Sequence, residues 1–128
     1  MRLLLDTHAF FWWCAGSGRL SLPARRAIAD ESNDVLISAA TAWEIATKHR
    51  IGRLPDAEAL ALDITGAIRG QNFEELPITV EDAARAGALP GPHRDPFDRI
   101  LIAQALARNL VFISNESPFD RYGVRRLW

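Results

Sequence analysis

Short apolar runs alternate with helix-forming segments along the whole of this 128-residue chain. A continuous apolar run of four or five residues is typical of a strand that is buried on both faces of a sheet. The clearest runs are residues 2–5, 34–37 and 110–114. Strands that alternate with helices predict an α/β fold, in which helices cover both faces of a parallel sheet. The length suits one domain, and we expect residues 1–128 to form it.

Capping residues, prolines and glycines indicate where the helices begin and end. Helices are expected at about 8–15, 22–31, 39–50, 57–69, 80–88 and 96–108, with a short helix or turn at 116–122. The expected N-caps of the helices at 39–50, 57–69, 80–88 and 96–108 are Ser38, Asp56, Thr79 and Asp95. Two weaker strands are expected at 73–76 and 124–127.

Composition argues against several classes of protein. No apolar run approaches the roughly 20 residues that a membrane-spanning helix needs, and the first residues lack the pattern of a signal peptide. Cys14 is the only cysteine, so an internal disulfide is excluded and a cytoplasmic location is expected. The apolar neighbours of Cys14 predict that it lies in the core. The formal net charge of −1 gives no bulk electrostatic case for nucleic-acid binding.

Four acidic residues occupy comparable places relative to the predicted strands. Asp6 directly follows the first strand, and Glu116 follows the strand at 110–114. Glu44 lies in the helix after the second strand, and Asp98 lies in the first turn of the helix that begins at residue 96. Because the carboxyl ends of parallel strands share one edge of the sheet, these four side chains are expected to converge there.

Converging carboxylates with no lysine near them raise one another's pKa, and a divalent cation removes the conflict. Mg²⁺ takes oxygen ligands, keeps several waters and commonly lies between carboxylates and a phosphate. A bound metal also lowers the pKa of water and stabilises charge on phosphorus. Convergence of the four acids therefore predicts metal-assisted hydrolysis of a phosphodiester.

The acids also have structural explanations. Asp6 is a candidate N-cap of the helix that follows it, and Asp95 and Asp98 fit a capping box. Glu44 can pair with Lys48 one helical turn later, although its apolar neighbours make an unpaired charge there costly. Glu116 can simply cap or solvate the last turn.

The aromatic run at residues 10–13 is more aromatic than one helix face can bury, so we expect it to form core and a protein interface. Base stacking is the alternative. His8, His49 and His93 have no metal-ligand spacing, and we assign them no role in catalysis.

Several segments together resemble PIN-domain proteins of the VapC toxin type, and the resemblance covers essentially the whole chain in order. They are LLLDTHAFFWW, SAATAWEIATKHRIGRL, HRDPFDRILIAQAL and FISNESPFDRYGVRRLW. The resemblance implies a three-layer α/β/α sandwich around a short parallel sheet. It further implies a small ribonuclease that uses Mg²⁺ or Mn²⁺, forms a homodimer and is silenced by a cognate antitoxin.

By position, the first three acids of the family fall on Asp6, Glu44 and Asp98. The fourth falls on Glu116, in a segment that usually reads Thr/Ser-x-Asp and here reads Ser-Asn-Glu. Glutamate is one methylene longer than aspartate, so ligation through water is an alternative to direct ligation at Glu116.

The resulting hypothesis is an endoribonuclease whose principal metal is held by Asp6 and Asp98. Glu44 and Glu116 complete the acidic pocket. Supporting roles are expected for Asp95, Thr7 and Ser114, and RNA-positioning roles for Arg94 and Arg99.

Three other classes are weighed against this one. A haloacid-dehalogenase phosphatase needs Asp-x-Asp after the first strand, and His8 stands at the second place. A response-regulator receiver needs a lysine late in the chain, and Lys48 is the only lysine. A PIN-like module that only binds a partner is the remaining alternative.

Overall fold

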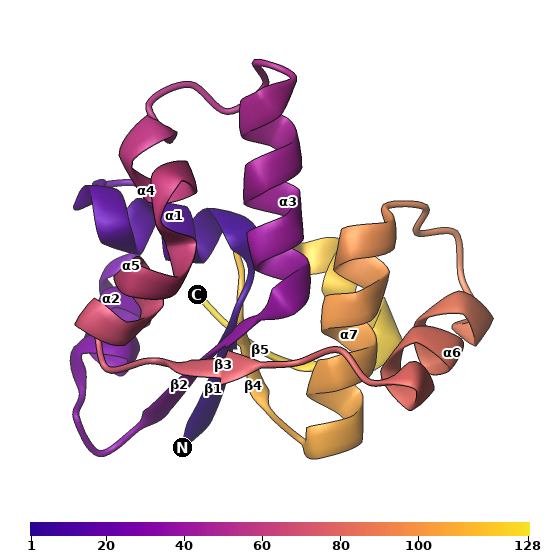
Figure 1. Cartoon of the computed structure of the whole chain (residues 1–128). Helices are drawn as coiled ribbons and strands as arrows, with labels where there is room; N and C mark the ends of the chain where they lie inside the picture. Colours follow the sequence, from indigo (N-terminus) through magenta and orange to yellow (C-terminus); the bar gives the residue numbers. More distant parts are fainter.

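The computed structural model describes residues 1–128 and has a central sheet with helices packed on both faces (Figure 1). The strands are β1 (Arg2–Leu5), β2 (Asp34–Ser38), β3 (Glu74–Leu76), β4 (Val111–Ile113) and β5 (Arg125–Leu127). The helices are α1 (Thr7–Ala15), α2 (Leu22–Ala29), α3 (Ala39–Arg50), α4 (Glu58–Leu62), α5 (Ile64–Gly70), α6 (Val80–Ala88), α7 (Pro96–Arg108) and the 3-10 helix η1 (Ser117–Tyr122). The predicted α/β architecture is confirmed.

The five strands are all parallel, in the order β3-β2-β1-β4-β5. β1 is the central strand, and its Leu4 lies opposite Leu36 of β2 on one side and Phe112 of β4 on the other. The chain leaves β1 toward β2 but leaves β4 toward β5, so the connections diverge between β1 and β4. In open parallel sheets, a crevice forms beyond the carboxyl ends of the strands at such a point.

The alternation of side chains along β1 divides the core into two layers. Leu3 and Leu5 are fully buried in the cluster that includes residues of α1, α2 and α5. Leu4 is fully buried in the opposite cluster, with residues of α7 and with Phe119 of η1. A strand buried on both faces is the reason for the continuous apolar run that the sequence shows at residues 3–5.

Three of the four predicted caps are confirmed. The Ser38 hydroxyl accepts a hydrogen bond from Ala40 N at 3.0 Å at the start of α3. Thr79 forms a reciprocal capping box with Asp82 at the start of α6, and Asp95 caps α7.

The predicted helix over residues 57–69 and its cap are wrong. Asp56 has a left-handed backbone, with φ at 68°, and makes no capping bond to α4. The segment is divided into α4 and α5 at Asp63, whose carboxylate accepts a hydrogen bond from Gly66 N at 2.9 Å and caps α5. A short acidic side chain that bonds to the backbone offers an alternative to helix continuation, which explains the break.

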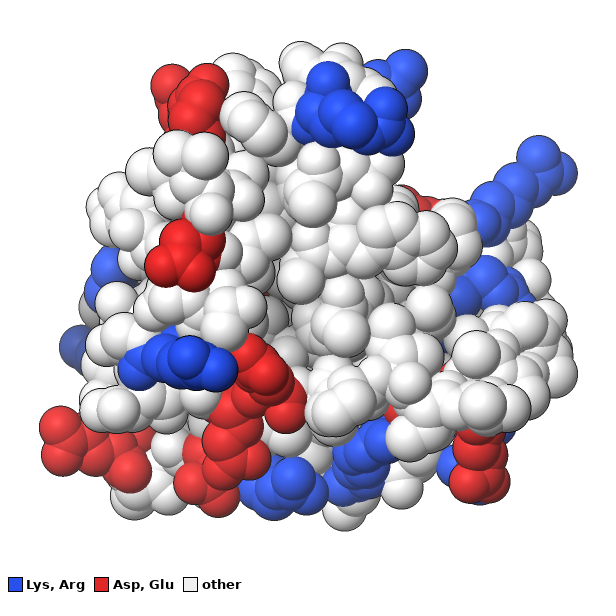
Figure 2. Space-filling model, in the orientation of Figure 1, with Lys and Arg blue, Asp and Glu red and all other residues white.

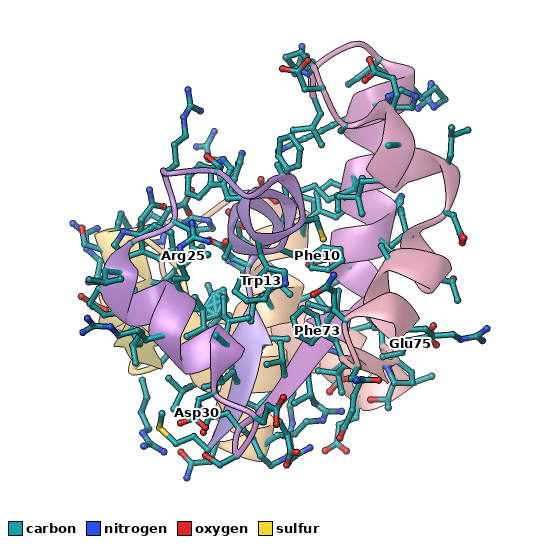
Figure 3. All side chains as sticks on the ribbon, turned by 90° about the vertical axis from the view of Figure 1, so that its left-hand side faces the viewer. Phe10, Trp13, Arg25, Asp30, Phe73 and Glu75 are labelled. Carbon is teal, nitrogen blue, oxygen red and sulfur yellow. The ribbon has the colours of Figure 1, made fainter.

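The aromatic residues of α1 pack on the core from one side. Phe10 is fully buried, and Trp13 lies against Phe73 with ring centroids 6.2 Å apart (Figure 3). Trp12 is partly exposed and contacts Trp128, with centroids 5.8 Å apart. Cys14 is exposed, so its predicted place in the core is wrong; the last turn of α1 faces solvent.

No helix of the chain has both the length and the apolar character that crossing a membrane requires.

Candidate active site

Asp6 stands at the carboxyl end of β1, where the connections of the sheet diverge. It is the N-cap of α1, and its Oδ1 accepts a hydrogen bond from Ala9 N at 2.8 Å. The residue is only 5% exposed. Burial raises the pKa of Asp6 to about 6, against hydrogen bonds from Ser114 and Ala9 that lower it. The capping explanation is therefore confirmed, but the carboxylate also lies where a site would form.

Ser114 and Glu116 reach the same place from the end of β4. Ser114 is fully buried, and its hydroxyl accepts a hydrogen bond from Glu116 N at 3.1 Å. The charge of Glu116 adds to the effect of burial on the pKa of both Asp6 and Asp98. Its carboxylate is therefore within electrostatic range of both aspartates.

Glu44 projects from α3 into a buried position, with its side chain 4% exposed. Thr7 Oγ1 donates a hydrogen bond to Glu44 Oε1 at 2.5 Å and also lies 3.3 Å from Thr41 Oγ1. Lys48 forms an ion pair with the other oxygen of Glu44. The Thr7 hydroxyl thus holds the Glu44 carboxylate in place, and the supporting role of Thr7 stays a prediction.

Lys48 lies close to the candidate acids, in contrast to the expectation that no lysine is near them. The carboxylates were expected to converge with no lysine near them, yet Lys48 contacts Glu44 and lies in the electrostatic range of Asp95 and Asp98. The pairing of Glu44 with Lys48 was foreseen from their spacing. Its place beside the other acids depends on how α3 packs against α7, which local spacing does not reveal.

Asp95 and Asp98 occupy the start of α7. Asp95 Oδ1 accepts hydrogen bonds from Phe97 N at 2.8 Å and from Asp98 N at 3.2 Å. The predicted reciprocal capping box is not formed, because the Asp98 carboxylate turns instead to His93, whose Nε2 lies 2.9 Å from Asp98 Oδ2. Burial is the largest cause that raises the pKa of Asp98 to about 7; His93 lowers it, and the charges of Asp95, Glu116 and Glu44 raise it.

His93 is the residue of the site that sequence reasoning missed. It lies in the proline-rich segment before α7, where its backbone N–H donates to the Tyr122 hydroxyl at 3.1 Å and its ring packs 5.3 Å from that of Phe119. These contacts hold the imidazole beside Asp98. Three prolines around it were the only available signal of an ordered loop.

Arg99 is bonded to the fold, and its expected RNA-positioning role stays a prediction. Its guanidinium donates to three backbone carbonyls, those of Ala86, Leu89 and His93, and so ties the segment between α6 and α7 to the start of α7. Arg94 is exposed, and its expected role remains a prediction. Charges of both signs are scattered over the face in Figure 2, and some positive and negative side chains lie next to one another along its lower part.

The donor chemistry of this site fits a hard divalent cation. No three His, Cys, Asp or Glu side chains are arranged to enclose a metal ion. Mg²⁺ does not require such a cage, because it is usually bound through one or two carboxylates and several waters. Burial that raises the pKa of both Asp6 and Asp98 is the expected mark of carboxylates that lack a compensating cation.

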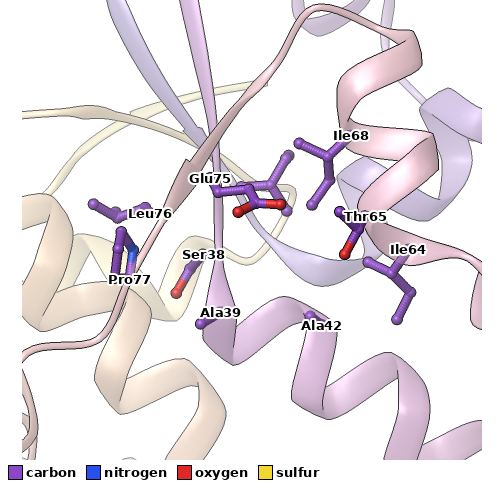
Figure 4. Close-up of a pocket in the computed structure, with 10 residues that line it drawn as sticks. Ser38, Ala39, Ala42, Ile64, Thr65, Ile68, Glu75, Leu76 and Pro77 are labelled. Carbon is purple, nitrogen blue, oxygen red and sulfur yellow. The ribbon is translucent and has the colours of Figure 1, made fainter.

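A separate recess of about 280 Å³ lies between α5 and the edge of the sheet at β3 (Figure 4). Its lining is mainly apolar, and Glu75 is the one charged residue in it. None of the predicted site residues lines this recess, so it is distinct from the acidic site.

The fold and the site define a parallel α/β domain that gathers carboxylates at the carboxyl edge of its sheet. The PIN domain family model matches residues 3–124, and the chain belongs to this family, in its VapC type. Ribonuclease VapC22 of Mycobacterium tuberculosis is 36% identical over 109 residues, which are 81% of this chain and 78% of that protein. Ribonuclease VapC16 of the same organism is 42% identical over 62 residues, which are 48% and 43% of the two chains.

Solved structures agree on the fold. VapBC2 from Rickettsia felis, bound to a DNA fragment from its promoter, matches with a TM-score of 0.70 over 99% of this chain and 98% of that chain, at 16% identity. Mycobacterium tuberculosis VapC20, a toxin that cleaves the sarcin-ricin loop, matches with a TM-score of 0.66 over 95% of both chains, at 17% identity.

Proposed function

We propose that residues 1–128 form one PIN-like domain that works as a metal-dependent endoribonuclease, the toxin of a toxin–antitoxin pair. The observation that carries the proposal is the group of carboxylates beyond β1 and β4, in which Asp6 is buried and Asp98 and Glu116 are partly buried. Membership of the VapC type and the 36% identity to a ribonuclease support the same reaction.

Asp6 and Asp98 are the proposed ligands of Mg²⁺ or Mn²⁺, and Glu44 and Glu116 complete the acidic pocket. When bound, the metal would supply an activated water and offset the negative charge of the phosphate. The other residues orient these acids. Ala9 N–H and Ser114 hold Asp6, and His93 holds Asp98.

Asp95 and Thr7 have positioning roles in the same proposal. Asp95 sets the first turn of α7 and thereby the place of Asp98, since it accepts hydrogen bonds from Phe97 N and Asp98 N. Thr7 orients Glu44 through its hydroxyl. Both act through another residue and would contact neither the metal nor the RNA.

The partners proposed are an RNA substrate, a cognate antitoxin and a second copy of the chain, in the cytoplasm where RNA and antitoxin are found. VapBC assemblies among the structures with this fold support the antitoxin. We assign the antitoxin to the partly exposed aromatic surface of α1, at Trp12 and Trp13.

The test is cleavage of RNA by the purified protein with Mg²⁺ or Mn²⁺, with EDTA, and after Asp6→Asn or Asp98→Asn. Each substitution is expected to lower the rate by about 100-fold or more, the size that losing one electrostatic contact in an active site typically has. Asp34→Asn is the matched control, because Asp34 is exposed at the start of β2, the opposite end of the sheet.

Unchanged cleavage by the Asp6→Asn and Asp98→Asn variants would refute the assignment of these ligands. Absence of cleavage by the unmodified protein, together with no binding of Mg²⁺ in a calorimetric titration, would favour the module that only binds a partner.

A further inference from the structure

We propose that Lys48 binds a phosphate of the RNA substrate beside the acidic site, and that Glu44 serves chiefly to hold Lys48 there. The inference rests on the proposed ribonuclease function and assigns one more residue to it. It also gives Glu44 a role that differs from metal ligation.

The carboxylate of Glu44 is already satisfied by the protein. One oxygen accepts the Thr7 hydroxyl at 2.5 Å, and the other is paired with Lys48. The side chain is 4% exposed. A buried carboxylate with a hydrogen bond and an ion pair has the partners that burial demands, so it needs no metal to compensate its charge.

The ammonium of Lys48 has capacity left. A lysine ammonium has three N–H donors, and the structure gives Lys48 one hydrogen bond, to Glu44. Its side chain is 28% exposed, so it remains open to a ligand. Partial burial lowers the pKa of Lys48, but the bond to Glu44 and the charges of Asp95 and Asp98 outweigh this and raise it. Lys48 therefore remains a cation that is bonded to Glu44 and lies within electrostatic range of Asp95 and Asp98.

Two arginines near the site are bonded to the protein. Arg99 donates to three backbone carbonyls, and Arg126 is bonded to Asp120 and to the carbonyl of Ser114. The His93 ring is directed to Asp98. Arg94 is exposed next to His93, whereas Lys48 is the cation held in direct contact with one of the acids of the site, Glu44.

A phosphate that approaches this site meets a group of carboxylates, which repel it. A bound metal would offset part of that repulsion, and a fixed ammonium close to the same carboxylates offsets more of it. Lysine is a common phosphate ligand because it acts as a compact point charge. In a chain of formal net charge −1, such a local cation replaces the basic surface that is otherwise usual in nucleic-acid binding.

The experiment measures RNA binding without cleavage, in an Asp6→Asn background. Affinity for a single-stranded oligoribonucleotide is determined at several salt concentrations, with and without Mg²⁺. The proteins compared are Asp6→Asn alone and Asp6→Asn combined with Lys48→Met or with Lys48→Arg. Loss of one phosphate contact should lower the slope of log affinity against log salt by about 0.7. The affinity at low salt should fall about tenfold, as for the loss of one charged hydrogen bond. Lys48→Arg should retain most of the slope.

The matched control is Arg85→Met, which breaks the exposed pair of Arg85 with Glu81, also one helical turn apart, on α6. It should leave both slope and affinity unchanged. Thermal unfolding shows whether Lys48→Met folds; if it does not, Lys48→Gln keeps a hydrogen-bonding group for Glu44 without the charge.

Unchanged RNA affinity and salt slope in Lys48→Met would overturn the proposal. So would a loss of cleavage together with unchanged RNA affinity and weaker Mg²⁺ binding by calorimetry, since Lys48 would then act on the metal site. If the unmodified protein binds RNA through Lys48 but does not cleave it, the ribonuclease function fails while the phosphate contact stands.

Discussion

The ionised carboxylate of Asp98 should lower the stability of the fold, and Asp98→Asn measures by how much. The structure raises the pKa of Asp98 from 3.8 to about 7, chiefly by burial. At about 1.36 kcal/mol per pKa unit, this corresponds to about 4 kcal/mol against the ionised form in the fold. Asparagine has nearly the shape of the protonated acid and no charge, so Asp98→Asn removes this cost, although its hydrogen bonds differ. We therefore expect Asp98→Asn to raise the free energy of unfolding by about 2–4 kcal/mol at pH 8.

The pH dependence gives the prediction its sign. Folding raises the pKa of Asp98, so the stability contributed by its protonated form is full below about pH 4 and is lost as the pH rises through 7. The advantage of Asp98→Asn should therefore be large at pH 8 and small at pH 5. Urea unfolding in EDTA, followed by circular dichroism at both values, measures it.

With Mg²⁺ present, the parent protein should become more stable than Asp98→Asn. Mg²⁺ that binds the folded protein stabilises it by mass action, and Asp98→Asn should lose most of that gain. The exposed Asp34→Asn control should leave stability unchanged at both pH values. A variant Asp98→Asn that is less stable than the parent at pH 8, or equally shifted at pH 5 and pH 8, would refute the reasoning.

Two further predictions concern other parts of the chain. Burial alone would raise the pKa of Asp82, but hydrogen bonds from Arg108, Thr79 N and Gln104 hold it at about 2. Asp82→Ala should therefore lower the free energy of unfolding by about 2–3 kcal/mol in urea at pH 7. That contribution is present above about pH 4 and lost as the pH falls toward 2, so a cost that is unchanged at pH 2 would contradict it. Replacing Trp12 and Trp13 together by alanine should abolish co-purification with the cognate antitoxin, whereas Trp43→Ala on α3 should not; retained co-purification by a folded double variant would remove α1 as the docking surface.

The elements that the sequence predicts well are those with a strong local pattern. The runs at residues 3–5 and 111–113 could only be buried strands, and Ser38, Thr79 and Asp95 could be recognised as caps from their neighbours. The break at Asp63 was missed because an aspartate within an amphipathic pattern is compatible with a continuous helix until its side chain turns to the backbone.

The candidate site was predicted where parallel topology alone was enough. Asp6 and Glu116 follow neighbouring strands, so their proximity is a consequence of strand order. His93 was missed because it comes to Asp98 through a loop anchored by Tyr122 and Phe119, which are far away in the sequence. Lys48 was misjudged for a similar reason, since only the packing of α3 on α7 brings it near the acids of α7.

Asp82 and Asp98 show how the same side chain serves structure in one place and chemistry in another. Both are aspartates in the first turn of a helix, and both are mostly buried. Asp82 has an arginine fork and a backbone cap, so its pKa falls to about 2 and its charge stabilises the fold. Burial and three acidic neighbours raise the pKa of Asp98 to about 7, although its bond with His93 lowers it, so the charge of Asp98 destabilises the fold.

A carboxylate that lowers stability persists when another ligand compensates it, and a divalent cation is the ligand that this geometry suits. The direction of the pKa shift thus separates the aspartate that holds α6 to α7 from the one that we assign to the metal. Helix position alone would not have distinguished them, because both residues lie in the first turn of a helix.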